Sequence, residues 1–360
     1  MSVGIYIHVP FCAKKCPYCD FYSCRYTKED AELYTNAIIR DIEQLTEKLQ
    51  ADTIYFGGGT PSLISYKLIE KILYAIYNEF GVNMPEITIE VNPCTVNIEK
   101  LKQYKKVGIN RLSIGVQSAN DNELELLGRN HNFQKAEEII IAAKEIGFNN
   151  ISCDLMIGIP EQTKDSLKRS IDKLSGLGIQ HISSYILKIE KGTPFDDPEF
   201  IKQMPDDDHV SDLYLFMVDQ LKKYEFLQYE ISNFSKTGYE SRHNLKYWQC
   251  QEYLGFGPAA HSFYNSIRYY YSPDLSSFIK KSPEKLITDD TPASDDEKIM
   301  LGLRLTKGID LDSFPDKKHK ILSKISPLVK NGLIIKNGSR ISLTPEGFLV
   351  SNSIIAELIF

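Results

Sequence analysis

Hydrophobic residues follow two alternating patterns along the first part of the chain. Short runs rich in β-branched and aromatic residues are typical of strands, and longer stretches with apolar residues every three or four positions are typical of helices. The strand-like runs are residues 4–9, 53–56, 86–91, 111–116, 150–157 and 181–188, and the helical stretches are residues 28–49, 66–80, 97–107, 133–146 and 164–177. This alternation predicts an α/β fold with a parallel sheet, and six such units would leave a barrel open.

The pattern changes after a last predicted helix at residues 209–223. Residues 226–290 are rich in Tyr, Gly, Asn and Ser, which suits a connecting or site-covering segment. From Ser294 onward we expect two helices and a hairpin that turns at Asn337-Gly338, an outline typical of a small winged-helix-like α+β domain. The predicted organisation is a partial barrel over 1–225, a connecting segment over 226–290 and a C-terminal domain over 291–360.

Polar and glycine residues gather where the predicted strands end. They are Gly57-Gly58-Gly59-Thr60-Pro61, Glu90, Gln117 and Asp154. Taken singly, the glycine run fits a tight turn before a helix capped by Thr60, and the polar residues fit buried hydrogen-bonded groups. Ligands of parallel α/β folds bind at the carboxyl ends of the strands, so the shared placement favours one binding site at the mouth of the barrel.

The cysteines are unevenly distributed. Four of the seven lie between residues 12 and 24, and Cys12, Cys16 and Cys19 form a C-x3-C-x2-C loop directly after the first strand. Each thiolate could bind a different iron of a 4Fe-4S cubane, which would leave one iron open to another ligand. The alternative is a zinc knuckle that uses His8 or Cys24 as its fourth ligand.

The overall composition excludes several classes of protein. A hydrophobic fraction of 42% and a charged fraction of 25% are ordinary for a globular protein, and 360 residues suggest one large domain with a smaller one. The net charge of -6, without a block of Lys or Arg, makes nucleic acid an unexpected partner. No apolar run approaches the ~20 residues of a membrane span, and the first residues lack signal-peptide features, so we expect a cytoplasmic location.

A second group of aromatic and histidine residues lies outside the repeated units. The segment His243-Asn-Leu-Lys-Tyr247-Trp248 holds the only tryptophan, and Tyr253 to His261 follows it closely. A packed aromatic turn with hydrogen-bonded histidines would explain it. A porphyrin site would also explain it, because flat macrocycles favour aromatic walls and an imidazole can ligate iron.

Taken together, the motifs resemble the radical S-adenosylmethionine superfamily. Within this superfamily they resemble the branch that includes the oxygen-independent coproporphyrinogen III oxidases, and within that branch the HemW-type heme chaperones. The resemblance covers almost the whole chain and implies an incomplete (β/α)6 radical-SAM barrel. It rests on YIHVPFC-x3-C-x-YCDF from residue 6, GGGTP at 57–61, EVNP at 90–93, RLSIGVQ at 111–117, DLMIGIP at 154–160 and HNLKYW at 243–248.

The resemblance also implies cofactors and their residues. Cys12, Cys16 and Cys19 would hold the 4Fe-4S cluster, whose open iron would bind S-adenosylmethionine, the source of a 5'-deoxyadenosyl radical in such proteins. His243 would be the heme ligand. The residues around S-adenosylmethionine would be Tyr6, Gly58, Gly59, Thr60, Glu90, Gln117, Arg129 and Asp154.

Two departures from the oxidases favour the chaperones. Phe21 stands where the oxidases have a further cysteine, and only eleven residues precede Cys12, where the oxidases have a long extension. The resemblance then implies heme, heme-accepting proteins of the respiratory chain, an electron donor such as flavodoxin or ferredoxin, and transient membrane association. The alternative is an oxidase that converts two propionates of coproporphyrinogen III to vinyl groups. We assign no catalytic residue, and whether the chain is an enzyme stays open.

Overall fold

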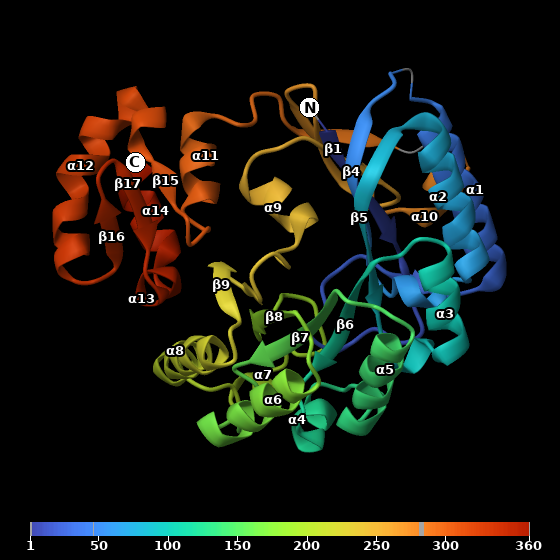
Figure 1. Cartoon of the computed structure of the whole chain (residues 1–360), viewed down its shortest axis with the longest axis horizontal. Helices are drawn as coiled ribbons and strands as arrows, with labels where there is room; N and C mark the ends of the chain where they lie inside the picture. The colour runs from blue at the N-terminus through green and yellow to red at the C-terminus, as the bar shows by residue number, and fades with distance from the viewer. Residues whose placement is uncertain (1, 46, 281–283, 360) are drawn as a thin grey trace.

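The computed structural model describes residues 2–45, 47–280 and 284–359. Most of these residues form a curled sheet with helices on its outer side, and the end of the chain forms a small domain beside it (Figure 1). Twelve strands make up the sheet, and six of them run parallel in the predicted chain order. These six are β1 (Ser2–Val9), β4 (Gln50–Gly58), β5 (Gly81–Val91), β6 (Arg111–Gln117), β7 (Ile151–Ile157) and β8 (His181–Ile186). The predicted open α/β barrel is confirmed.

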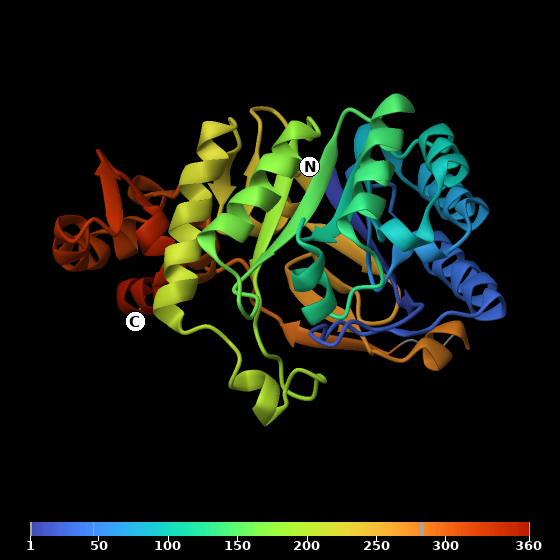
Figure 2. The same ribbon diagram turned by 90° about the horizontal axis from the view of Figure 1, so that it is seen from below.

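Five of the predicted helices connect these strands, and a sixth follows the last strand. They are α1 (Lys28–Glu43), α2 (Tyr66–Glu79), α3 (Ile98–Lys106), α5 (Phe133–Glu145), α6 (Lys164–Gly176) and α8 (Asp207–Lys223), with the short α4 (Asp121–Leu126) and α7 (Pro198–Ile201) as additions. Each of the six longer helices begins after a Thr, Ser, Asn or Asp whose side chain accepts a backbone N–H of the first turn. The first helix ends at Glu43 rather than at residue 49. Figure 2 shows the segment that carries α7 extending away from the barrel.

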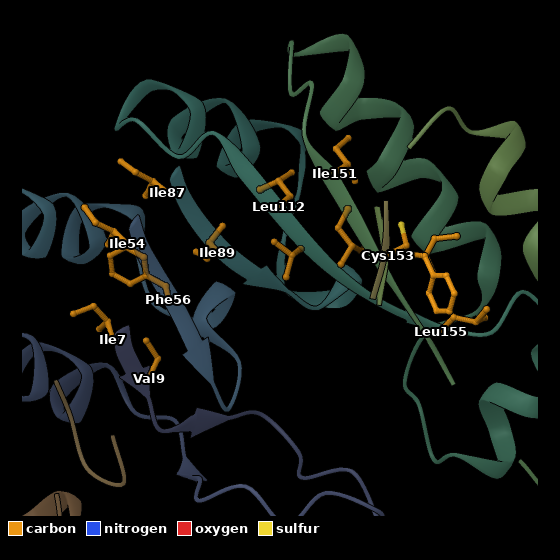
Figure 3. Close-up of a cluster of buried hydrophobic side chains, with 14 of the residues drawn as sticks. Ile7, Val9, Ile54, Phe56, Ile87, Ile89, Leu112, Ile151, Cys153 and Leu155 are labelled. Atoms are coloured by element: carbon orange, nitrogen blue, oxygen red, sulfur yellow. The ribbon is translucent and has the colours of Figure 1, made fainter. Parts of the chain in front are cut away.

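The two faces of the parallel strands differ in chemistry, because successive side chains point to opposite sides of a sheet. Aliphatic side chains on the outer face, such as Ile7, Ile54 and Leu112, are fully buried in the layer beneath the helices (Figure 3). Burying one such side chain contributes about 1.5–3 kcal/mol, so this layer can hold the barrel together. The inner face can then carry polar residues, among them Tyr6, His8, Thr53, Tyr55, Glu90, Arg111, Ser113, Asp154 and His181.

Residues 226–290 extend the sheet at both of its edges. At one edge β10 (Asn233–Ser235) pairs antiparallel with β8 and with β9 (Leu227–Glu230). At the other edge β11 (Tyr253–Phe256) runs parallel to β1, and β12 (His261–Tyr264), β13 (Ile267–Tyr271) and β14 (Lys285–Asp289) follow in antiparallel order. Two short helices, α9 (Arg242–Trp248) and α10 (Leu275–Ile279), lie between these strands in the sequence. None of these strands was predicted from the sequence.

The C-terminal domain contains the predicted helices and hairpin. Helices α11 (Asp295–Gly302) and α12 (Pro315–Lys330) precede β16 (Ile334–Asn337) and β17 (Arg340–Leu343), with Gly338 in the turn at a φ of 63°. The strand β15 (Ile309–Asp310) completes a three-stranded sheet, and α13 (Pro345–Leu349) and α14 (Ser351–Ile359) end the chain. The domain joins the barrel through backbone hydrogen bonds, one of which runs from Ile231 N–H to the Arg304 carbonyl at 2.9 Å. Of the helices in the described part of the chain, none is long and apolar enough to cross a membrane.

Candidate functional site

The predicted cluster loop, residues 12–19, leaves the carboxyl end of β1 at the mouth of the barrel. Cys12 ends the two-residue strand β2 (Phe11–Cys12), which pairs with β3 (Cys24–Arg25). The loop then turns so that Cys19 N–H donates to the Cys16 carbonyl at 3.1 Å. All three predicted ligands are only partly buried. Their thiols are therefore within reach of a group bound at the mouth.

The loop packs tightly against the rest of the mouth. Arg129 Nη1 donates to Cys16 Sγ at 3.3 Å, and Cys12 Sγ lies 3.6 Å from Thr60 Oγ1. A side chain at Gly59 would place its Cβ 2.8 Å from the Phe11 carbonyl oxygen and 3.1 Å from Cys12 Sγ. The glycine at this position is what allows the loop to approach so closely.

A zinc knuckle and a cubane make different demands on the geometry of this loop. Within the described ranges, no three His, Cys, Asp or Glu side chains converge on a point where a single metal ion could bind. A 4Fe-4S cluster does not need such convergence, because each thiolate binds a different iron. Both candidate fourth zinc ligands have other partners: the Cys24 thiol donates to the Pro10 carbonyl at 3.2 Å, and His8 Nε2 lies 3.1 Å from the Tyr22 carbonyl.

The glycine run after β4 connects the cluster loop to the barrel. Gly58 has a φ of 111°, which favours glycine, and a Cβ there would lie 2.7 Å from the His8 ring. Gly59 N–H donates to the Val9 carbonyl at 2.9 Å and Thr60 N–H to the Phe11 carbonyl at 2.7 Å. The predicted helix start is wrong in one respect. Only a single 3-10 turn follows, and the Thr60 side chain does not cap it.

Glu90 lies under this glycine run. It accepts hydrogen bonds from Gly58 N–H at 3.1 Å and from the Tyr55 hydroxyl at 3.0 Å. Burial raises the pKa of Glu90 to about 8, and the neighbouring carboxylate of Asp154 adds to the rise. No cation of the described residues forms an ion pair with this carboxyl, and the charge of Arg111 offsets only part of the rise in its pKa.

Three further predicted residues converge around Gly115 on β6. A Cβ at Gly115 would lie 3.1 Å from Gln117 Nε2, 3.3 Å from Arg129 Nη2 and 3.9 Å from Asp154 Oδ2. Arg129 is held there because its Nη2 donates to the Gly115 carbonyl at 2.9 Å. Burial raises the pKa of Asp154 to about 6. The structure therefore brings Gln117, Arg129 and Asp154 together at the mouth.

Two further residues of this region are His8, which the sequence suggested only as a possible zinc ligand, and Tyr55, which was not predicted. The Tyr6 hydroxyl lies 3.1 Å from His8 Nδ1, and the other nitrogen of His8 contacts the carbonyl of Tyr22, just beyond the cluster loop. Tyr55 bonds to Glu90 and lies beside Tyr6, with ring centroids 6.2 Å apart. Strand alternation could have revealed both, since Tyr6 and His8 share one face of β1 and Tyr55 lies opposite Tyr6 on β4.

His243 lies deeper in the barrel than the cluster loop, and its ring stacks on Tyr55 and Tyr6, with centroids 5.1 Å and 6.4 Å apart. It is 1% exposed and sits near Gly4 and Thr53, toward the amino ends of β1 and β4. Its Nδ1 lies 2.8 Å from Thr53 Oγ1 and its Nε2 lies 2.7 Å from the Tyr247 hydroxyl. Burial lowers the pKa of His243 to about 3. The role of His243 as a heme ligand stays a prediction, and in this conformation ligation would require the loss of one of these hydrogen bonds.

Comparison with known proteins defines the class of this chain. Residues 6–174 match the radical SAM superfamily and residues 296–350 match the HemN C-terminal domain. The chain also shares its fold with the radical SAM enzyme coproporphyrinogen III oxidase (HemN) from Escherichia coli, at a TM-score of 0.83 and 21% identity over 99% of this chain and 90% of that one. The protein is a radical SAM protein with a HemN-type C-terminal domain.

Bacterial relatives identify the family more closely. The chain is 32% identical to heme chaperone HemW from Lactococcus lactis, over 98% of this chain and 96% of the relative. It is 34% identical to heme chaperone HemW from Bacillus subtilis, over 98% of each protein. The chain belongs to the HemW family.

Proposed function

We propose that this protein is a heme chaperone that binds heme and passes it to acceptor proteins. The observation that carries this proposal is the similarity to heme chaperones HemW over nearly the full length of both chains. The radical SAM match and the HemN C-terminal match lie in the same chain. The chaperone role also agrees with Phe21 at the position where the oxidases have a further cysteine.

The mouth of the barrel suits the two cofactors that a radical SAM protein uses. Cys12, Cys16 and Cys19 would hold a 4Fe-4S cluster, which supplies low-potential electrons when bound. S-adenosylmethionine carries a positive ammonium and a positive sulfonium group. Their arrival would lower the cost of burying Glu90 and Asp154 as anions, since both pKa values are raised by burial.

The remaining predicted residues would orient S-adenosylmethionine. Gly58 and Gly59 allow His8 and the cluster loop to pack closely against this end of β4, and Tyr6, Thr60, Gln117 and Arg129 lie at the same mouth. Arg129 would also stabilise a thiolate at Cys16, to which it already donates a hydrogen bond. In this proposal the residues bind and orient the cofactors, and no side chain is required to transfer a proton.

The partners of the proposed chaperone follow from its task. Heme acceptors, with respiratory proteins as candidates, would take the cargo, and a flavodoxin or ferredoxin would reduce the cluster. Lys14, Lys15 and Phe21 are exposed in and beside the cluster loop and offer a small donor protein a contact surface. Delivery to respiratory proteins would bring the chaperone into transient contact with a membrane.

A second candidate function is the oxidation of coproporphyrinogen III. The fold shared with the Escherichia coli oxidase favours it. Anaerobically reconstituted protein, given S-adenosylmethionine, a reductant and coproporphyrinogen III, distinguishes the two. The chaperone should form no protoporphyrinogen IX, whereas steady product formation would assign the oxidase function instead.

A further inference from the structure

An axial heme ligand needs a ring nitrogen that iron can reach. The chain has seven histidines. Four of them, His8, His131, His181 and His243, are buried, and each has at least one ring nitrogen in a hydrogen bond. Direct access of heme to these four would require a rearrangement of the barrel interior.

The three exposed histidines differ in their surroundings. His209 on α8 has its Nε2 at 2.8 Å from the Gln162 carbonyl. His319 lies on α12 of the C-terminal domain, and no aromatic ring of the described residues stacks on it. His261, on β12, is exposed, and its imidazole has no hydrogen-bond partner among the described residues. It is therefore the exposed histidine of the barrel sheet whose ring nitrogens are both available.

The ring of His261 is nonetheless held in one orientation. Its cross-strand partner on β13 is Tyr270, and the two rings stack with centroids 5.0 Å apart and an angle of 14° between their planes. Stacking occupies one face of the imidazole, and no described residue forms a hydrogen bond with the two nitrogens of its ring. A preorganised ring loses less conformational entropy on binding than a free side chain does.

His261 also lies on the same sheet surface as the cofactor residues. Gly255 on β11 pairs with Tyr6 on β1. The backbone of His261 packs directly against Gly255, since a Cβ at Gly255 would lie 2.1 Å from the His261 carbonyl oxygen. The strand β12 therefore adjoins the part of the barrel wall that holds Tyr6. Just after β11, Gly257 approaches β1, since a Cβ there would lie 2.6 Å from the His8 carbonyl oxygen. On the same face Arg268 stacks over Phe263, with the guanidinium 5.1 Å from the ring centroid.

We infer that His261, oriented by Tyr270, is the residue that ligates heme iron when heme first binds, on the sheet surface beside the barrel mouth. The inference rests on the proposed heme-binding function. It differs from the assignment of His243, which could ligate iron only after losing its hydrogen bond to Thr53 or the one to Tyr247. Partial burial of the ring and the charge of Arg268 both lower the pKa of His261, which favours the neutral imidazole that a ligand needs.

The test is a titration of reconstituted protein with hemin, followed by the Soret band and by the spin state of the heme iron in electron paramagnetic resonance. His261→Ala should weaken binding by roughly tenfold or more and change the spin-state signal, since one coordination bond is lost. His319→Ala is the matched control, because it removes an exposed histidine far from the sheet surface, and it should bind as the parent protein does. Free imidazole added to His261→Gly should restore the Soret position.

The possible outcomes separate this inference from the proposed function. If the parent protein binds hemin and His261→Ala gives the same affinity and spectrum, His261 is not the ligand, while heme binding stands. If hemin binding is lost in His243→Ala and kept in His261→Ala, His243 is the heme ligand. If the parent protein shows no saturable binding, both the inference and the heme-chaperone proposal fail. An unchanged iron-sulfur spectrum, together with rescue by imidazole, excludes misfolding as the cause of a loss in the His261 variants.

Discussion

The close approach of Gly58 to His8 predicts that Gly58→Ala destabilises the protein, and Gly147→Ala serves as the matched control. Gly58→Ala introduces two costs. The first is a backbone φ of 111° that suits glycine, and the second is a Cβ that would lie 2.7 Å from the His8 ring. A side chain in a sparsely populated backbone region costs about 1–3 kcal/mol. Overpacking a tight site costs about 1–3 kcal/mol more.

Gly147→Ala isolates the first of these costs. Gly147 has a similar φ of 98°, but an added Cβ there would meet no atom within 4 Å. We therefore expect Gly147→Ala to lower the free energy of unfolding by about 1–3 kcal/mol. Gly58→Ala should lower it by about 2–6 kcal/mol, a large part of the usual stability of a protein.

The assay is urea unfolding of the cofactor-free protein, followed by far-ultraviolet circular dichroism. A double-mutant cycle with His8→Ala tests the cause, because removal of the imidazole should relieve the clash and bring Gly58→Ala close to the cost of Gly147→Ala. A clash with His8 would be ruled out if Gly58→Ala lowered the free energy of unfolding by no more than Gly147→Ala does. It would also be ruled out if His8→Ala left the extra destabilisation by Gly58→Ala unchanged.

Three other predictions concern the mouth of the barrel. Replacing Cys12, Cys16 or Cys19 by Ser should abolish 4Fe-4S absorption after anaerobic reconstitution, whereas Cys24→Ser should retain it; iron loss in Cys24→Ser alone would contradict the ligand set. The pKa of Glu90 is raised to about 8, so between about pH 4.5 and 8 the folded protein keeps a proton on Glu90 that the unfolded chain releases. The cofactor-free protein should therefore lose stability as the pH rises through this range. Glu90→Gln should make the stability less dependent on pH. Chromatography of reactions with coproporphyrinogen III should show no protoporphyrinogen IX, and its accumulation would support the oxidase function.

The barrel could be predicted from the sequence because its two periodicities are long and regular. Alternation of strand-like and helical stretches identified the six parallel strands and their connecting helices. The strand-end residues could also be predicted to lie together, since the carboxyl ends of parallel strands share one edge. The convergence of Gln117, Arg129 and Asp154 around Gly115 agrees with that expectation.

The features that escaped prediction depend on contacts between distant parts of the chain. The strands from β9 to β14 have three to five residues each, too few for a clear periodicity. His243 is buried because α9 packs near β4, and its bond to Thr53 joins residues 190 positions apart. Figure 1 shows α9 between the C-terminal domain and the first strands, a position that no local pattern indicates.

In the proposed function, one chain holds an iron-sulfur cluster and also binds heme for transfer. An anaerobic hemin titration of protein whose iron and sulfide have been quantified beforehand tests both properties together. We expect a 4Fe-4S content consistent with one cluster per chain, and saturable heme binding that leaves the cluster signal intact. A protein that holds the cluster but shows no saturable heme binding would contradict the proposed function.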